Sequence, residues 1–232
     1  MLFLLSCLMS YEVEDKRGEV AIEQTRAVWY ENFKAGHSSS VKIHSIVGTQ
    51  GESHGSGNYF KIGKEKFILT AAHVVNDSAA LFLLDKGEYV FLDVVYIDRY
   101  RDIAIVVPER DLRDAKAVNY RANMQEDILG ISVNYTGHPG ELGKATFRGM
   151  IAQSGIGYAV LQSFAIPGSS GSVVFDNGGK IIGVVSAVSV GMYFPPIPQL
   201  DENVVYIQRV TGFDKKTIKE LIKKWRIERA SK

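Results

Sequence analysis

Short apolar runs recur along most of the chain at intervals of about ten residues. Between residues 41 and 47 they alternate with polar side chains, and glycine-rich turns such as Asp176–Gly179 separate neighbouring runs. A period of two with turns of this kind is typical of antiparallel strands. We therefore expect strands at 41–47, 59–62, 66–69, 80–84, 89–97, 103–107, 128–133, 143–151, 158–162, 172–175, 181–190 and 203–210, with a polar loop over 48–58.

Two segments have helical periodicity instead. In residues 18–34 the apolar positions recur every three or four residues, and Gly36 ends the pattern before a loop. Residues 214–229 have a similar apolar stripe and begin with an aspartate that can cap a helix. The expected organisation is a linker and helix over 11–36, then one all-β domain over 37–232, built as antiparallel barrels or a sandwich and including the last helix.

Composition narrows the class of protein. Of the 232 residues, 46% are hydrophobic and 23% are charged, which is typical of a soluble globular chain. The formal net charge is +1, so the overall charge gives no indication of nucleic-acid binding. The single cysteine, Cys7, excludes intrachain disulfides and favours a bacterial, archaeal or viral origin over a secreted eukaryotic one.

The first ten residues are apolar apart from two serines. They resemble a short signal or anchor segment, although no Lys or Arg precedes them and they are too short to span a bilayer. An early start codon or a buried N-terminal strand would explain them equally well. The chain is therefore expected to be exported if residues 1–10 act as a signal, and cytoplasmic otherwise, and membrane anchoring stays open.

A serine cluster, Ile166–Ser172, lies between two apolar runs. Alone, such a string would more often be a flexible loop. Flanking glycines, however, let the backbone turn sharply enough to present a nucleophilic hydroxyl together with backbone N–H groups. The position of Gly171 indicates Ser170 as the nucleophile, and the amides of Gly168 and Ser170 are the candidate oxyanion donors.

A candidate base and a candidate acid lie upstream of this cluster. His73 follows the apolar strand 67–69, and Asp102 precedes the apolar strand 103–107. Each alone would more often be structural. Together with Ser170 they supply what serine catalysis requires, because a hydroxyl needs an imidazole to accept its proton and the imidazole needs a carboxylate to orient it.

The three segments resemble the signature boxes of the trypsin-like (chymotrypsin-fold) serine proteases. Thr70–His73 resembles the Thr-Ala-Ala-His box, Asp102–Ile105 the Asp-x-Ala-x-Leu box, and Gly168–Ser172 the Gly-x-Ser-Gly-Gly/Ser box. The resemblance covers about residues 40 to 225. It implies two antiparallel six-stranded β-barrels that meet at a cleft, with an N-terminal and a C-terminal helix.

Within this family the chain is most similar to the bacterial heat-shock (high-temperature-requirement) type. Pro167, the absence of disulfides, the leading helix and the segment Tyr135–Gly140 all carry this similarity. Those relatives usually continue into a peptide-binding PDZ domain, which we do not expect here. Ser169 and Ser172 depart from the commonest residues of the serine box, and neither change affects the triad chemistry.

The resemblance also implies a specificity pocket. Phe164 would lie at its base, and the substrate-binding strand would include Ser186, Ala187 and Val188. Since none of these is charged, we expect small or aliphatic substrate side chains. His138 could line the cleft, as a pocket histidine does in glutamyl-specific relatives, but a loop position is the simpler interpretation.

The sequence therefore predicts a serine endopeptidase that acts on polypeptides through His73, Asp102 and Ser170. No metal, cofactor or nucleic-acid partner is implied, and the oligomeric state is open. An inactive protease-fold binding module and an esterase are the alternatives. The last helix, with eight Lys or Arg against three Asp or Glu from residue 214 onward, could bind a membrane or nucleic acid, but a solvated outer face is the simpler explanation.

Overall fold

The computed structural model describes residues 33–48, 51–193 and 197–231. The predicted signal or anchor over residues 1–10, the linker, and most of the helix predicted over 18–34 therefore lie outside the described residues. Among the residues that are described, no helix has both the length and the apolar character needed to cross a membrane.

The N-terminal half of the described chain forms a closed barrel. Its strands follow one another around the barrel in the order β1-β4-β5-β6-β3-β2, and β1 also pairs with β2. A short β7 (Val118–Asn119) adds to β2 in parallel. The six barrel strands are β1 (Ser40–Ile46), β2 (Glu52–Ile62), β3 (Glu65–Thr70), β4 (Ala80–Asp85), β5 (Glu88–Asp98) and β6 (Ile103–Pro108).

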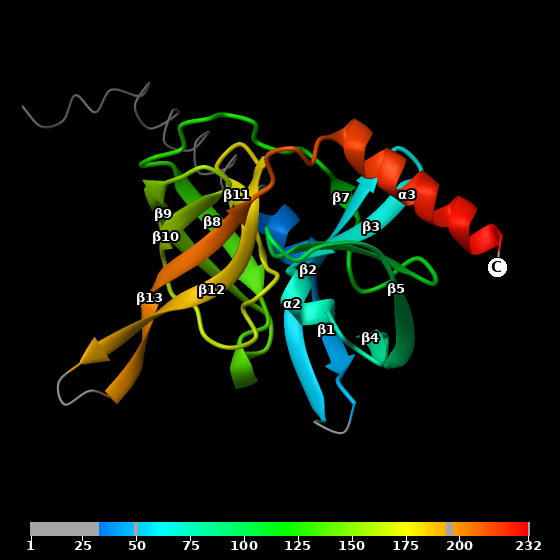
Figure 1. Cartoon of the computed structure of the whole chain (residues 1–232), viewed down its shortest axis with the longest axis horizontal. Helices are drawn as coiled ribbons and strands as arrows, with labels where there is room; N and C mark the ends of the chain where they lie inside the picture. The colour runs from blue at the N-terminus through cyan, green and yellow to red at the C-terminus, as the bar shows by residue number, and fades with distance from the viewer. Residues whose placement is uncertain (1–32, 49–50, 194–196, 232) are drawn as a thin grey trace, which may run out of the picture.

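The C-terminal half forms a second closed barrel, in the order β10-β13-β12-β11-β8-β9. Figure 1 shows the two barrels side by side, with α3 (Lys215–Ala230) returning to the first barrel. This confirms the predicted all-β class with two antiparallel six-stranded barrels. The strands are β8 (Ser132–Gly137), β9 (Ala145–Ser154), β10 (Tyr158–Gln162), β11 (Val173–Asp176), β12 (Ile181–Tyr193) and β13 (Ile197–Arg209).

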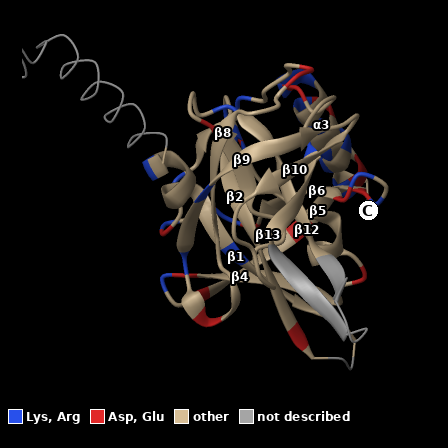
Figure 2. Ribbon diagram, turned by 90° about the vertical axis from the view of Figure 1, so that its left-hand side faces the viewer, with Lys and Arg blue, Asp and Glu red and all other residues tan. Residues whose placement is uncertain are grey.

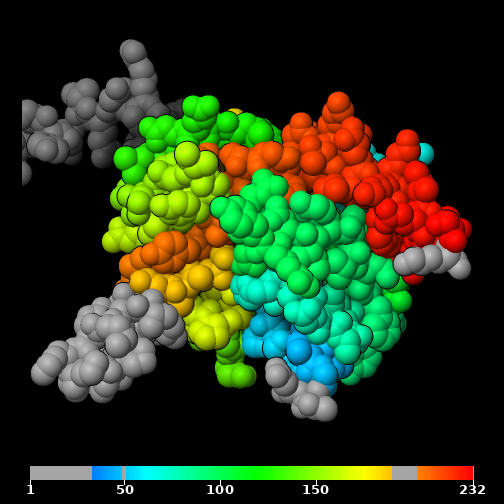
Figure 3. All heavy atoms as spheres, in the orientation of Figure 1, coloured from blue at the N-terminus to red at the C-terminus, as the bar shows by residue number. Residues whose placement is uncertain are grey.

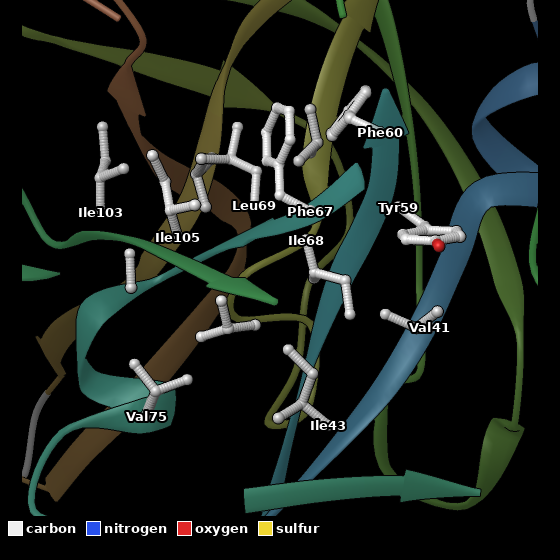
Figure 4. Close-up of a cluster of buried hydrophobic side chains, with 14 of the residues drawn as sticks. Val41, Ile43, Tyr59, Phe60, Phe67, Ile68, Leu69, Val75, Ile103 and Ile105 are labelled. Carbon is white, nitrogen blue, oxygen red and sulfur yellow. The ribbon is translucent and has the colours of Figure 1, made fainter. Parts of the chain in front are cut away.

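The larger of two buried clusters joins the barrels. It fills the first barrel with side chains such as Phe67 and Ile105 (Figure 4) and continues through Val173 of the second barrel to Ile218 and Ile222 of α3. Because burying a large apolar side chain contributes about 1.5–3 kcal/mol, this shared core fixes how the barrels face each other. The smaller cluster lies inside the second barrel.

The predicted polar loop over 48–58 is wrong from Glu52 onward, because β2 begins there. The residues from Ser40 to Ile46 pair with this part of β2, with His44 opposite His54. Close packing explains the glycines, since a Cβ atom on Gly55 would lie 2.6 Å from the Val74 side chain. The segment has few apolar residues because its backbone, rather than its side chains, makes the contacts.

The leading helix and one strand also differ from expectation. Helical structure continues past Gly36 to residue 39. A Cβ atom on Gly36 would lie 3.4 Å from the Phe175 ring, and the Gly36 carbonyl accepts the side-chain amide of Asn58 at 3.0 Å, so this residue packs within the fold instead of ending the helix. The strand predicted over 128–133 begins only at Ser132. Residues 128–131 form a turn instead, closed by a hydrogen bond between the first and last of them at 3.2 Å.

The turn between β11 and β12 and the start of α3 agree with prediction. β11 and β12 pair as an antiparallel hairpin around residues 176–179. The Asp214 carboxylate accepts the Thr217 amide at 2.7 Å, which caps α3. β12 and β13 extend beyond the predicted 181–190 and 203–210 and form a hairpin that projects from the second barrel (Figure 1).

A buried carboxylate holds the segment that leads from the first barrel toward β7. Asp85 is 1% exposed and accepts hydrogen bonds from the amides of Arg113 and Asp114 and from the Arg110 guanidinium, at 2.5 to 3.1 Å. Burial alone would raise the pKa of this carboxyl, but these hydrogen bonds lower it to about 2. Asp85 therefore stabilises the fold in its ionised form.

The contribution of Asp85 should depend on pH. A folded-state pKa of about 2, against 3.8 for the free group, gives roughly 2 kcal/mol of stability that is present above pH 4 and is lost as pH falls toward 2. Asp85→Asn should lower the free energy of unfolding at pH 7 by at least this amount. The difference in unfolding free energy between the variant and the wild type should become smaller as the pH falls. Urea denaturation at several pH values measures this, with the exposed Asp114→Asn as control. A difference that stays constant down to pH 2 would contradict it.

Candidate active site

The pairing of β3 with β6 brings the predicted base and acid together. Thr70, the last residue of β3, lies opposite Ala104 near the start of β6. The chain then enters the short helix α2 (Ala72–Val75), whose valines are buried while the side chain of His73 is 49% exposed. Asp102 lies two residues before Ala104 and so comes to lie beside this helix.

Asp102 makes three hydrogen bonds that fix its carboxylate. Its Oδ1 accepts the His73 amide at 2.9 Å, and its Oδ2 accepts His73 Nδ1 at 2.8 Å. The hydroxyl of Ser186 on β12 donates to Oδ2 at 2.5 Å. Because a carboxylate only accepts, Nδ1 carries the imidazole proton in this contact, and Nε2 of the neutral ring is left as the acceptor.

The backbone and the charge of Asp102 are both held in unusual states. Its φ of +48° is left-handed, which costs a non-glycine residue about 1 kcal/mol or more. Burial would raise the pKa of the carboxyl, but the hydrogen bonds from His73 and Ser186 hold it below its ordinary value. The carboxylate therefore stays ionised beside the imidazole, as an orienting acid must.

The predicted nucleophile lies in a tight turn between β10 and β11. Gly168 has φ +94° and Gly171 has φ +87°, so both need the conformational freedom of glycine. A Cβ atom on Gly171 would lie 2.0 Å from the Ser56 carbonyl oxygen, which no side chain could tolerate. Ser170, between them, is half-exposed, whereas Ser169 and Ser172 are buried.

Ser56 of β2 attaches this turn to the first barrel. Its amide donates to the Ser170 carbonyl at 2.7 Å, and its hydroxyl donates to the Gly168 carbonyl at 2.7 Å. The same hydroxyl accepts the His138 amide at 2.8 Å, and the Ser56 carbonyl accepts the Thr70 hydroxyl at 2.6 Å. These contacts hold the turn from both ends, and sequence analysis missed them because it placed Ser56 in a loop.

The Ser170 turn and the His73 helix pack around the same glycine. A Cβ atom on Gly55 would lie 2.6 Å from the Val74 side chain and 3.1 Å from the Ser170 carbonyl oxygen. Among the described residues, no hydrogen bond joins the Ser170 hydroxyl to His73. Catalytic hydrogen bonds are often long before substrate binds. The lack of this hydrogen bond therefore does not argue against Ser170 and His73 as the catalytic pair.

Two backbone amides of the turn are available to a ligand. Gly171 donates to the Val185 carbonyl at 2.8 Å, and Ser169 donates to the Ile166 carbonyl at 3.0 Å. Within the described part of the chain, the amides of Gly168 and Ser170 donate to no other group. The two predicted oxyanion donors are thus the two free amides of this turn.

Two histidines lie behind the turn. A Cβ atom on Gly168 would lie 2.5 Å from the His138 carbonyl oxygen and 2.8 Å from His54 Nε2. Burial lowers the pKa of His54, with Lys42 as a second cause, and burial beside Lys144 lowers that of His138 to about 4. Both rings are therefore neutral at pH 7 and place no charge beside the turn.

The residues predicted to form the specificity pocket lie on the second barrel. Phe164 is partly buried, and its ring centroid lies 5.6 Å from that of Phe147. Phe147 and Val188 pack against the smaller buried cluster. Ala187 is exposed, and Ser186 contacts Asp102 in addition to its predicted place in the strand. Sequence analysis missed Phe147, whose only signal was a place in a predicted strand.

Solved structures with the same fold are proteases. A serine endoprotease from Yersinia pestis matches 84% of this chain and 66% of its own, at 19% identity and a TM-score of 0.64. The HtrA-type protease AlgW with tripeptide matches 84% and 63%, at 16% identity and a TM-score of 0.65. The active form of the Rv3671c protease from M. tuberculosis matches 77% and 78%, at 19% identity and a TM-score of 0.60. At these identities the likeness shows the fold.

Sequence comparison identifies the family. The uncharacterised protein y4bJ of Sinorhizobium fredii is 26% identical over 148 residues, which span 60% of this chain but only 23% of that protein. The model of the trypsin-like peptidase domain matches residues 55–184, more than half of the chain. This range includes His73, Asp102 and Ser170. The chain therefore belongs to the trypsin-like peptidase domain family.

Proposed function

We propose that this protein is a serine endopeptidase with Ser170 as nucleophile, His73 as general base and Asp102 as the orienting acid. The observation that carries the proposal is the bond between His73 Nδ1 and the Asp102 carboxylate at 2.8 Å, beside a turn with two free amides. Family membership supports serine-type hydrolysis, and the protease neighbours support peptides as the substrate class.

The proposed mechanism follows from these positions. Ser170 Oγ adds to the scissile carbonyl carbon while its proton passes to His73 Nε2, and the free amides of Gly168 and Ser170 stabilise the oxyanion. The intermediate then collapses as His73 gives that proton to the departing amine, which leaves an ester on Ser170. A water molecule then adds to the ester carbon while His73 takes its proton. His73 returns this proton to Ser170 Oγ as the ester bond breaks, which releases the carboxylic acid product.

Replacing Ser170 tests the nucleophile. Ser170→Ala should abolish both peptide hydrolysis and labelling by a serine-directed fluorophosphonate, because no hydroxyl remains to attack. Ser172→Ala is the matched control, since this serine lies two residues away with a buried hydroxyl that has no hydrogen-bond partner. Gel fluorescence and mass spectrometry of the labelled peptide provide the measurement.

Each other outcome has a meaning for this test. Labelling that persists in Ser170→Ala contradicts the assignment of Ser170 as the nucleophile. A wild-type protein that is folded but neither labelled nor active supports the alternative of an inactive protease-fold module. Hydrolysis of esters without any cleavage of peptides supports the esterase alternative.

Replacing Asp102 tests the orienting acid. Asp102→Asn should lower kcat by about four orders of magnitude, as the same change does in the chymotrypsin triad, because an amide holds the imidazole in the wrong tautomer. Fluorophosphonate labelling should slow in parallel. Steady-state kinetics on a peptide substrate measure the effect.

Asp98 is the matched control for this change. Its carboxylate accepts the amide of Arg101 at 2.9 Å and the side chain of the same residue at 2.8 Å, so it is engaged away from His73. Asp98→Asn should retain most of the activity. A loss of only a few-fold in Asp102→Asn, with a large loss in Asp98→Asn, would reverse the assignment.

Substrate preference follows from the apolar pocket residues. The Phe164 and Phe147 rings lie 5.6 Å apart, and Phe147 and Val188 pack against the same buried cluster. We propose that these apolar residues line the substrate pocket, so that small or aliphatic side chains are preferred. A peptide library should show Ala, Val or Leu before the cleaved bond, and Val188→Ala should admit larger aliphatic residues. A preference for Lys, Arg or Glu would contradict this pocket.

A further inference from the structure

Among the surface cavities of the described chain, three are each lined by at least three Lys or Arg and lie away from the proposed active site. The first, of 390 Å³, lies between α3 and the β2–β3 turn, and the second, also of 390 Å³, lies beside β7. The third, of 260 Å³, lies at the start of α3. We call the basic residues that line them the basic face: Lys61, Lys64, Lys116, Arg121, Lys180, Lys215, Lys219, Lys223 and Arg226.

The three cavities belong to one continuous surface. Arg121 lines both the second and the third cavity. Lys215 of the third lies one helical turn from Lys219 of the first, so the first and third cavities lie along the same stretch of α3. Figure 3 shows α3 at the surface of the molecule, where the chain reaches it after leaving the second barrel.

Charge is strongly segregated onto this face. Nine Lys or Arg and only two carboxylates, Glu65 and Asp214, line the cavities, which is an excess of seven positive charges. The whole chain has a formal net charge of +1, so the remaining residues carry an excess of six negative charges. Figure 2 shows basic residues along α3. The residues that line the three cavities are therefore far more basic than the chain as a whole.

The basic residues are not used to stabilise the fold. Within the described chain only Arg226 of the nine has an ion pair, with Glu65, and the other eight have none. Lys215, Lys219 and Lys223 are spaced four residues apart, and such like-charge neighbours destabilise a helix. Lys215 also lies in the first turn of α3, where the helix dipole disfavours a cation. An external partner with negative charge would make this arrangement favourable.

Exposed apolar side chains indicate which anionic partner fits. Ile227 lines the first cavity and is 61% exposed, and Met124 lines the third and is 52% exposed. The only aromatic residue lining the three cavities of the described chain is Phe175, which is buried and cannot stack on a base. Apolar side chains among cations favour a lipid interface over a nucleic acid.

We propose that the basic face binds the surface of a membrane that contains anionic lipids. The lysines and arginines would lie at the lipid phosphates, with Ile227 and Met124 at the level of the headgroups. Because the attraction to anionic lipid is strongest where these cations gather, the protein would bind with this face toward the membrane. None of the basic-face residues is among the proposed catalytic residues, so this inference goes beyond the proposed function and does not depend on it.

Vesicle sedimentation with the full chain tests the proposal. Binding to phosphatidylcholine vesicles with about one third phosphatidylglycerol should exceed binding to pure phosphatidylcholine by about tenfold or more. It should fall sharply at about 1 M salt, where the Debye length is only about 3 Å. Lys219→Glu with Lys223→Glu should remove most of the difference between the two vesicles.

Two exposed cations of the first barrel provide a matched control. Lys86 and Arg99, with 63% and 70% of their side chains exposed, line none of the three cavities. Lys86→Glu with Arg99→Glu changes the net charge by the same amount and should reduce anionic binding far less. Equal losses in the two double variants would show a response to net charge alone and would overturn the assignment to this face.

The remaining outcomes also decide the question. Equal binding to neutral and anionic vesicles would mean that another part of the full chain binds lipid, and it would overturn the proposal. Binding that is unchanged by salt and by Lys219→Glu with Lys223→Glu would also overturn the proposal. Binding to single-stranded DNA but not to vesicles, if lost in the same double variant, would assign the basic face to nucleic acid instead.

Discussion

The hydrogen bonds of Ser56 are the contacts on which the site depends, because they join the two barrels there. Ser56 belongs to β2 of the first barrel, yet its amide and hydroxyl bind the carbonyls of Ser170 and Gly168 in the second. Its hydroxyl also accepts the His138 amide, and Thr70, three residues before His73, binds its carbonyl. Ser56 is fully buried, so water cannot replace these bonds, and losing one would leave a buried polar group unsatisfied. The proposed base and nucleophile are thus held by one residue.

Three residues around this junction have positive φ values. Asp102 has a left-handed backbone, and Gly168 and Gly171 have positive φ values within one turn. Each is held by contacts with distant segments, such as the Gly171 amide on the Val185 carbonyl and the Ser186 hydroxyl on Asp102. The apolar core shared by the barrels supplies the free energy that keeps these contacts in register. The conformation of the site therefore depends on contacts with the fold around it, and its own residues do not favour it.

Charged side chains have different roles at the proposed site and on the basic face. At the site, the Asp102 carboxylate is partly buried, with 18% of its side chain exposed, and a hydrogen bond pairs it with His73. On the basic face, charge is exposed and mostly unpaired, and its effect comes from number and proximity. α3 contributes to both the core and the basic face, because Ile218 and Ile222 pack into the shared core while its lysines are exposed to solvent. A membrane-bound orientation would leave the proposed catalytic residues off the bound face.

The sequence by itself determined most of the strand pattern and the fold class, because alternation and turn residues are local signals, and it predicted His73, Asp102 and Ser170 as the catalytic residues. It failed where backbone contacts replace apolar side chains, as in the first half of β2, and so it missed Ser56. The bond of Ser186 to Asp102 and the gathering of Lys61, Arg121 and Lys215 on one face were decided only by the tertiary structure. The physical reason is the same in each case: these groups are far apart along the chain, and only strand register and barrel packing bring them within reach of one another.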